Sequence, residues 1–131
     1  MKAKYVMDAS AVIAVVLNEP YSAELPSLFM DSVITTVNLT EALTVLERKF
    51  NPDIELLWES VGNFIQAHYP VNQQLAKRVL EINRHTSKYG LSLGDKFCIA
   101  LGMELKLPIY TADRAWKSFE QLLDIKITLI R

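Results

Sequence analysis

Four acidic side chains are placed where they could act together. Asp8 directly follows the apolar segment KYVM, and Asp113 follows the segment PIY after two further residues. Glu41, in TVNLTEALTVL, and Asp95, in LSLGDKFCIAL, are expected in the first turns of two further helices. If the apolar segments are parallel strands, their carboxyl ends share one edge of a sheet, where ligands bind in such folds. We therefore expect the four carboxylates to converge at that edge.

A cluster of carboxylates needs a cation, because the negative charges raise one another's pKa values. Only Asp113 has a basic residue four positions later, Lys117, that could pair with it on a helix. Oxygen ligands without histidine or thiolate select a hard ion such as Mg²⁺ or Mn²⁺. Such an ion can acidify water and hold the oxygens of a phosphodiester. The pattern predicts hydrolysis of a phosphate ester, with Ser10 and Thr111 orienting a water or a carboxylate.

Helix capping is the alternative explanation for the same acids. Asn38 to Glu41 and Ser92 to Asp95 have the spacing of a capping box. The other possible N-caps are Asp8, Ser10, Thr111 and Asp113. An acid in the first turn of a helix contributes only ~0.3–1 kcal/mol through the helix dipole. In this alternative the chain is a binding module, and replacing Asp95 would leave its function intact.

The elements that must position these acids alternate between strands and helices. The predicted strands are residues 4–7, 32–35, 69–71, 108–110 and 126–130. Helical faces are indicated by Leu39, Leu43, Leu46 and Phe50, and by Leu75, Val79 and Ile82. Pro52 after Asn51 marks a further helix start, and residues 92–106 are apolar nearly all round, as in a helix packed on several sides. The pattern predicts an α/β fold with a mostly parallel sheet covered on both faces.

The composition limits the class of protein. The chain has 131 residues, is 50% hydrophobic and has a net charge of -1, which predicts one globular domain over residues 1–131. The single cysteine, Cys98, excludes an internal disulfide and is expected in the core of a protein from a reducing compartment. No signal peptide and no apolar run of about 20 residues is visible. We expect a cytoplasmic protein without membrane contact.

Four segments, in order along the chain, resemble the motifs of the PIN-domain ribonucleases, and among these the VapC-type toxins of toxin–antitoxin pairs. The segments are VMDASAVIAVVLNEP, VNLTEALTVL, LSLGDKFCIALG and PIYTADRAW. The resemblance implies a three-layer α/β/α domain that is a Mg²⁺- or Mn²⁺-dependent endoribonuclease. Its metal ligands would be Asp8, Glu41, Asp95 and Asp113, assisted by Ser10 and Thr111. It further implies a homodimer, a cognate antitoxin that holds it inactive, and transfer or ribosomal RNA as substrate.

Basic residues beside the predicted acidic centre could bind the RNA backbone. The candidates are Arg84, Lys88, Lys96 and Arg114. The alternative is that Lys77, Glu81, Arg84 and Lys88 form the solvated face of a helix, and the two interpretations are compatible. Tyr89 is the one aromatic residue placed to stack on a base.

The segment DIELLWESVGNFI is apolar on more than one side. Core packing is the default expectation for it. The surplus apolar surface could form a dimer seam or a groove for an antitoxin helix.

Other functions stay open at this point. An RNA-processing nuclease without an antitoxin, or a noncatalytic PIN-like binding module, would have the same fold. A phosphorelay receiver, by contrast, is rejected, because it needs an aspartate after the third strand and the segment YPVNQQ has none.

Overall fold

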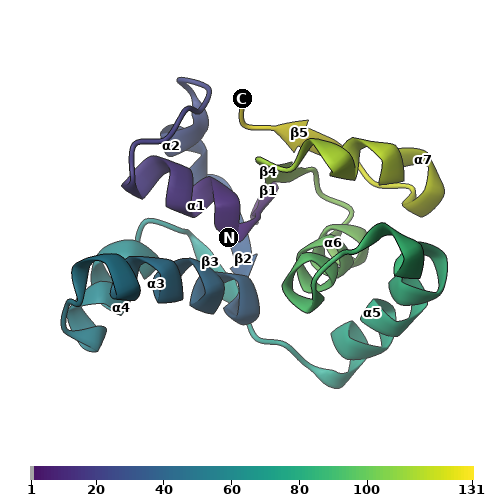
Figure 1. Cartoon of the computed structure of the whole chain (residues 1–131), viewed down its shortest axis with the longest axis horizontal. Coiled ribbons are helices and arrows are strands. Elements are labelled where there is room, and N and C mark those ends of the chain that lie inside the picture. Colours follow the sequence, from purple (N-terminus) through teal and green to yellow (C-terminus); the bar gives the residue numbers. More distant parts are fainter. Residues whose placement is uncertain (1) are drawn as a thin grey trace.

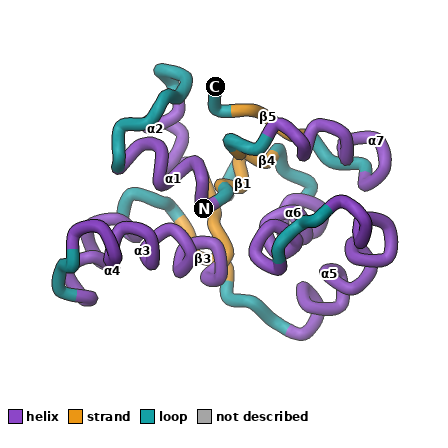
Figure 2. Tube along the Cα trace, in the orientation of Figure 1, coloured by secondary structure: helices purple, strands orange, loops and turns teal. Residues whose placement is uncertain are grey.

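The computed structural model describes residues 2–131, and its centre is a five-stranded sheet in which all strand pairs are parallel. The strands are β1 (Tyr5–Met7), β2 (Ser32–Thr35), β3 (Ala67–Tyr69), β4 (Ile109–Thr111) and β5 (Ile127–Leu129). Their order across the sheet is β3-β2-β1-β4-β5 (Figure 1). Figure 2 shows the strands in orange between the helices. Because β1 is central and pairs with both β2 and β4, its carboxyl end lies between the carboxyl ends of two neighbours.

Helices cover both faces of this sheet (Figure 1). The α-helices are α1 (Ala9–Val16), α2 (Leu25–Leu28), α3 (Thr36–Phe50), α4 (Ile54–Gly62), α5 (Gln73–Thr86), α6 (Leu93–Leu105) and α7 (Glu120–Leu123). Short 3-10 helices are η1 (Phe29–Asp31), η2 (Ser87–Tyr89) and η3 (Arg114–Phe119). In the described part of the chain, no helix combines the length and the hydropathy needed to cross a bilayer.

The core is split by the sheet into two clusters. Val6 and Val33 pack with side chains of α5, α6, η3 and α7, whereas Met7 and Ile34 pack with side chains of α1, α2, α3 and α4. Successive strand residues point to opposite faces, so β1, β2 and β4 contribute side chains to both clusters. The predicted three-layer α/β/α architecture is confirmed.

Some predicted boundaries were wrong. Residues 32–35 match β2, but β3 begins two residues before the predicted strand and ends at Tyr69, because Pro70 has no N–H to donate to the sheet. Helix α4 begins at Ile54 with Asp53 as its cap, so Pro52 lies outside it. Phe50, expected on the buried face of α3, is 58% exposed in the last turn.

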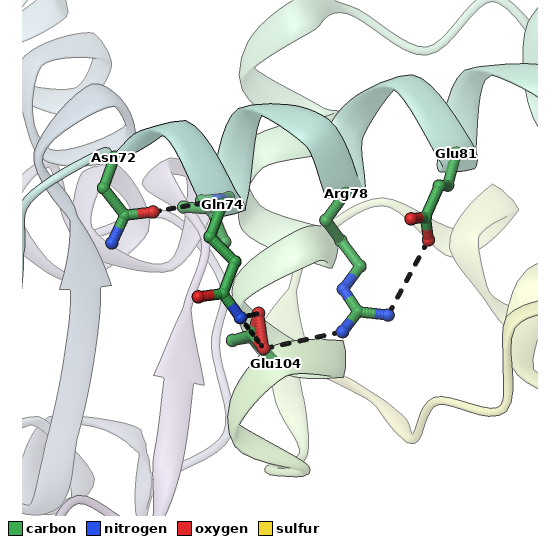
Figure 3. Close-up of polar contacts among 6 residues, drawn as sticks. Asn72, Gln74, Arg78, Glu81 and Glu104 are labelled. Atoms are coloured by element: carbon green, nitrogen blue, oxygen red, sulfur yellow. Dashed lines mark hydrogen bonds and ion pairs between the residues drawn. The ribbon is translucent and has the colours of Figure 1, made fainter.

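A polar network fixes α5 against α6, the helix that carries Asp95 (Figure 3). Nε2 of Gln74 donates to Oε1 of Glu104 over 3.0 Å, and Nη2 of Arg78 lies 3.5 Å from Oε2 of the same glutamate. Arg78 also pairs with Glu81 at 3.9 Å. The predicted interior face of α5, formed by Leu75, Val79 and Ile82, is buried. The positive charge of Arg78 is balanced by its pairing with Glu81 and Glu104.

Candidate active site

Asp8 is buried at the carboxyl end of β1. It occupies the N-cap position of α1 but makes no side-chain capping bond, so the capping explanation is wrong for this residue. Its Oδ2 atom instead accepts hydrogen bonds from Oγ of Ser10 at 2.7 Å and from Oγ1 of Thr111 at 2.9 Å. Only 6% of Asp8 is exposed. The end of β4 and the start of α1 therefore converge on one carboxylate.

The environment of Asp8 disfavours its charge. Burial raises the pKa of Asp8 to about 6, and the negative charge of Asp95 adds to this rise. The hydrogen bonds from Ser10 and Thr111 lower the pKa and only partly offset the burial. At neutral pH the site holds a desolvated negative charge, which a nearby cation would stabilise.

The two hydroxyl groups that bind Asp8 are themselves held by the backbone of the β4–η3 turn. The N–H of Ala112 donates to Oγ of Ser10 at 2.9 Å, and the N–H of Asp113 donates to Oγ1 of Thr111 at 3.1 Å. Each oxygen accepts a backbone hydrogen and gives its own hydrogen to the carboxylate. Ser10 and Thr111 are therefore placed to orient Asp8, and their role in a reaction stays a prediction.

Glu41 reaches the site from α3. This helix begins at Thr36 and is capped by Thr35, whose Oγ1 accepts from the N–H of Asn38 at 2.9 Å. Glu41 is thus in the second turn, and the predictions of a first-turn position and an Asn38 cap were wrong. Its carboxylate rests on Gly94 in the first turn of α6, where an added Cβ would overlap the carboxylate oxygens. Glu41 consequently lies beside the residue that precedes Asp95.

Asp95 both caps α6 and contributes charge to the site. The N–H of Ser92 donates to Oδ2 of Asp95 at 3.0 Å, and the N–H of Asp95 donates to Oγ of Ser92 at 3.1 Å, which confirms the predicted capping box. The buried thiol of Cys98 lies one helical turn later. Burial raises the pKa of this thiol, and the charges of Asp8, Asp95 and Glu41 raise it further. The thiol is therefore neutral, and its partner is the carbonyl of Met7.

Asp113 lies at the exposed border of this cluster. Its Oδ1 caps η3 by accepting from the N–H of Ala115 at 3.0 Å. It joins the other acids only through its own N–H, which binds Thr111. Within residues 2–131, no group of three or more His, Cys, Asp or Glu side chains is close enough to hold a metal ion.

The donor chemistry nevertheless fits a hard divalent ion. The four acidic side chains offer carboxylate oxygens, and Ser10 and Thr111 add hydroxyl oxygens. Oxygen ligands of this kind are those that Mg²⁺ prefers. The Glu41 carboxylate lies in space that the Cβ atom of any residue other than glycine at position 94 would fill. Glycine inside a helix costs about 1 kcal/mol relative to alanine, so Gly94 in the sequence was a signal of close approach. This signal was missed, and so were the hydrogen bonds of the Asn38 side chain to Glu41 and to the carbonyl of Gly94.

The predicted RNA-binding residues lie near the start of α6 and beside Asp113. Arg84 and Lys88 are exposed, and Nζ of Lys96 donates to Oδ1 of Asn83 at 2.9 Å. Arg114 follows Asp113 and donates from Nη2 to the carbonyl of Arg131 at 3.2 Å. Lys77 and Glu81 are also exposed, so this face of α5 is solvated as the alternative required.

Tyr89, half exposed, already has two neighbours. Its ring packs edge-on against Phe119 with centroids 5.1 Å apart, and Nζ of Lys88 lies 5.6 Å from its centroid. Stacking of Tyr89 on a base stays a prediction.

Helix α4 and the segment that follows it present several apolar side chains to solvent. Ile54, Leu56 and Phe64 are 71%, 59% and 63% exposed, so the expectation of core packing was wrong for them. Beside α4, a cavity of about 420 Å³ is lined by residues of α1, α2, α4 and the segment after α4, among them Val12, Pro26 and Phe64. Exposed apolar surface of this kind marks interaction sites.

Comparison with known proteins assigns the chain to a family. The model of the PIN domain matches residues 5–122, and the chain belongs to this family. No curated protein matches the sequence.

Solved structures share the fold at low sequence identity. DNA-bound VapBC from Salmonella typhimurium has TM-score 0.75 and 19% identity, covering 98% of this chain and 99% of that chain. FitAcB from Neisseria gonorrhoeae has TM-score 0.69 and 18% identity, with coverages of 94% and 95%. VapC20 from Mycobacterium tuberculosis, a toxin that cleaves the sarcin–ricin loop, has TM-score 0.68 and 14% identity, with coverages of 87% and 93%.

Proposed function

We propose that the protein is a Mg²⁺- or Mn²⁺-dependent endoribonuclease and the toxin of a VapBC-type pair, acting in the cytoplasm. The observation that carries the nuclease proposal is the buried Asp8 carboxylate at the carboxyl edge of the sheet. Burial and the charge of Asp95 disfavour the ionised form of Asp8. Glu41 packs against Gly94 at the start of α6, the helix that carries Asp95. A structural cap has no need of this arrangement, whereas a cation-binding site does.

Different side chains would bind the ion, orient Asp8 and bind the RNA. Asp8, Glu41, Asp95 and Asp113 would hold the ion, and Ser10 and Thr111 fix the orientation of Asp8 through their hydroxyl groups. When bound, the ion acidifies water and offsets charge on the scissile phosphate. Arg84, Lys88, Lys96 and Arg114 would bind flanking phosphates, since cations beside an acidic centre draw the nucleic-acid backbone toward it. Transfer or ribosomal RNA is the proposed substrate, and cleavage of the sarcin–ricin loop by VapC20 supports the latter.

The toxin role rests on the surface of α4 and on the similar complexes. Several proteins of the same fold were solved as VapBC assemblies. Exposed acidic residues accompany the exposed apolar residues of α4, namely Glu55 and Glu59 in the helix and Asp53 at its N-cap, so the surface suits an amphipathic partner segment that carries basic residues. We propose that an antitoxin covers this surface, and that the toxin forms a homodimer.

Cleavage assays test the nuclease proposal. Purified protein is incubated with transfer RNA and a ribosomal RNA fragment, with Mg²⁺ or with EDTA. We expect cleavage only with the metal, and a loss of at least about a hundredfold in Asp8→Asn, equivalent to several kcal/mol of transition-state stabilisation. Asp53→Asn is the matched control, because Asp53 caps α4 through the N–H of Leu56, remote from the other acids. Cleavage that survives EDTA or Asp8→Asn would contradict the mechanism.

Binding assays test the antitoxin proposal. The product of a small neighbouring open reading frame is co-expressed with the protein, and the affinity of the pair is measured. Phe64→Ser should weaken binding by at least about tenfold, as expected for a large aromatic side chain at an interface. Leu80→Ser is the control, because Leu80 is equally exposed, at 67%, but lies on α5. Equal losses in both variants would argue against α4 as the binding surface.

A noncatalytic binding module is the second candidate, and the capping bonds of Asp95 and Asp113 favour it. It predicts that Asp8→Asn and Glu41→Gln leave partner binding unchanged and that no RNA is cleaved under any metal condition. The cleavage assay above separates the two candidates.

A further inference from the structure

Asn38 links three parts of the candidate site through one buried side chain. It is fully buried and is the third residue of α3. Its Nδ2 atom donates to Oε1 of Glu41 at 2.9 Å and to the carbonyl of Gly94 at 2.9 Å. Its Oδ1 atom accepts from the hydroxyl of Thr35 at the end of β2. The residue thus connects β2, the Glu41 carboxylate and the first turn of α6.

The network allows only one orientation of the Asn38 amide. The carboxylate of Glu41 and the carbonyl of Gly94 can only accept, so the amide atom facing them is the nitrogen, and the amide oxygen faces the hydroxyl of Thr35, which has a hydrogen to donate. The two acceptors, a carboxylate and a carbonyl, then face the two hydrogens of the NH₂ group. Every donor and acceptor of the side chain that the structure places has a partner, as buried polar groups require.

Capping does not explain this arrangement. The start of α3 is capped by the oxygen of Thr35, which accepts from the backbone N–H of Asn38, so the amide group of the Asn38 side chain caps no backbone N–H. The contact with Gly94 joins residues 56 positions apart in sequence. Both acceptors of the amide hydrogens lie where the Glu41 carboxylate meets α6, since Glu41 rests on Gly94.

We propose that Asn38 is a positioning residue that holds the Glu41 carboxylate at a fixed place beside Asp95. The proposal rests on the metal-dependent function and deepens it, because it identifies the group that orients one ligand of the ion. Partners that orient metal ligands typically change metal affinity or activity by roughly 10- to 100-fold when they are removed.

Calorimetric titration with Mn²⁺ alone tests this role in the full chain. We expect Asn38→Ala to raise the Kd for Mn²⁺ by roughly 10- to 100-fold. In a Glu41→Gln background the same substitution should add less than about a twofold change, because two residues that act through one contact are not additive. Asn72→Ala is the matched control, since Asn72 caps α5 through a single bond to the N–H of Leu75. It should lower thermal stability without changing the Kd.

The outcomes separate this proposal from the function on which it rests. Wild-type protein that takes up no Mn²⁺ overturns both. Uptake by the wild type with an unchanged Kd in Asn38→Ala, or with the full effect retained in Glu41→Gln, overturns the positioning role alone.

A measurement on the wild type covers the case in which Asn38→Ala does not fold. In ¹⁵N NMR spectra, the side-chain amide signals of Asn38 should exchange slowly with solvent and should shift when Mg²⁺ is added. The amide signals of the exposed Asn72 should not shift. An Asn38 signal that is unmoved at saturating Mg²⁺ would overturn the proposal.

Discussion

The starts of α1 and α6 offer an instructive comparison. Each has an aspartate among apolar neighbours and a serine within three positions of it, Asp8 with Ser10 and Asp95 with Ser92. At α6 the pair is local, because Ser92 and Asp95 exchange bonds with each other's backbone. At α1 the serine and the distant Thr111 both donate to the carboxylate, which makes no cap.

The difference teaches what an acid at a helix start contributes. Asp95 is partly exposed and stabilises its own helix, whereas Asp8 is buried and its charge opposes folding. The same residue type therefore has opposite effects on stability in the two places. Measurements that compare the two helix starts should show this contrast.

The largest expected effect concerns pH and Asp8. The pKa of Asp8 is raised from 3.8 to about 6 in the folded protein, so the stability associated with its protonated form is present below 3.8 and is lost as the pH rises through 6. Metal-free Asp8→Asn should gain about 3 kcal/mol of unfolding free energy relative to wild type between about pH 3 and about pH 7.5. Urea denaturation in EDTA at both values measures this. A constant difference between the two proteins would show that burial does not perturb Asp8.

The next largest effect concerns the contact between α3 and α6. Gly94→Ala inserts a methyl group into the Glu41 carboxylate and should cost about 1–3 kcal/mol, as overpacking does. It should also weaken Mn²⁺ binding, because Glu41 must move. Gly102→Ala is the matched control, since its methyl group would overlap Ile109 in the core instead. We expect the two variants to lose comparable stability. Only Gly94→Ala should bind Mn²⁺ more weakly. Equal Mn²⁺ affinities would remove Glu41 from the ligand set.

The smallest expected effect is the one that completes the comparison. Asp95→Asn should lower the unfolding free energy by about 1 kcal/mol or less at neutral pH, because a cap and a dipole interaction are weakened. Its sign is opposite to that of Asp8→Asn at the same pH. Thermal or urea denaturation of both variants side by side is sufficient. Stabilisation by Asp95→Asn would mean that repulsion among the acids outweighs the capping box.

The sequence was sufficient for the features that depend on local pattern. Alternating apolar strands and helical faces predicted the parallel sheet, and the spacing of Ser92 and Asp95 predicted their capping box. It was insufficient where competition between neighbours decides. Thr35 and Asn38 are both good N-caps, and only the end of β2 at Thr35 selects the former. The contact of Asn38 and Glu41 with Gly94 joins distant segments, so no local pattern contains it.

The position of the last residue has a practical consequence for handling the protein. All five strands run in one direction, so β5 delivers Arg131 to the same edge as the acids, where it binds Arg114 and the carbonyl of Pro20. A purification tag fused after Arg131 would begin next to the basic residue that follows Asp113. A tag placed before Lys4, whose N–H binds the carbonyl of Asp31 at the opposite edge, would leave that approach open to a polynucleotide.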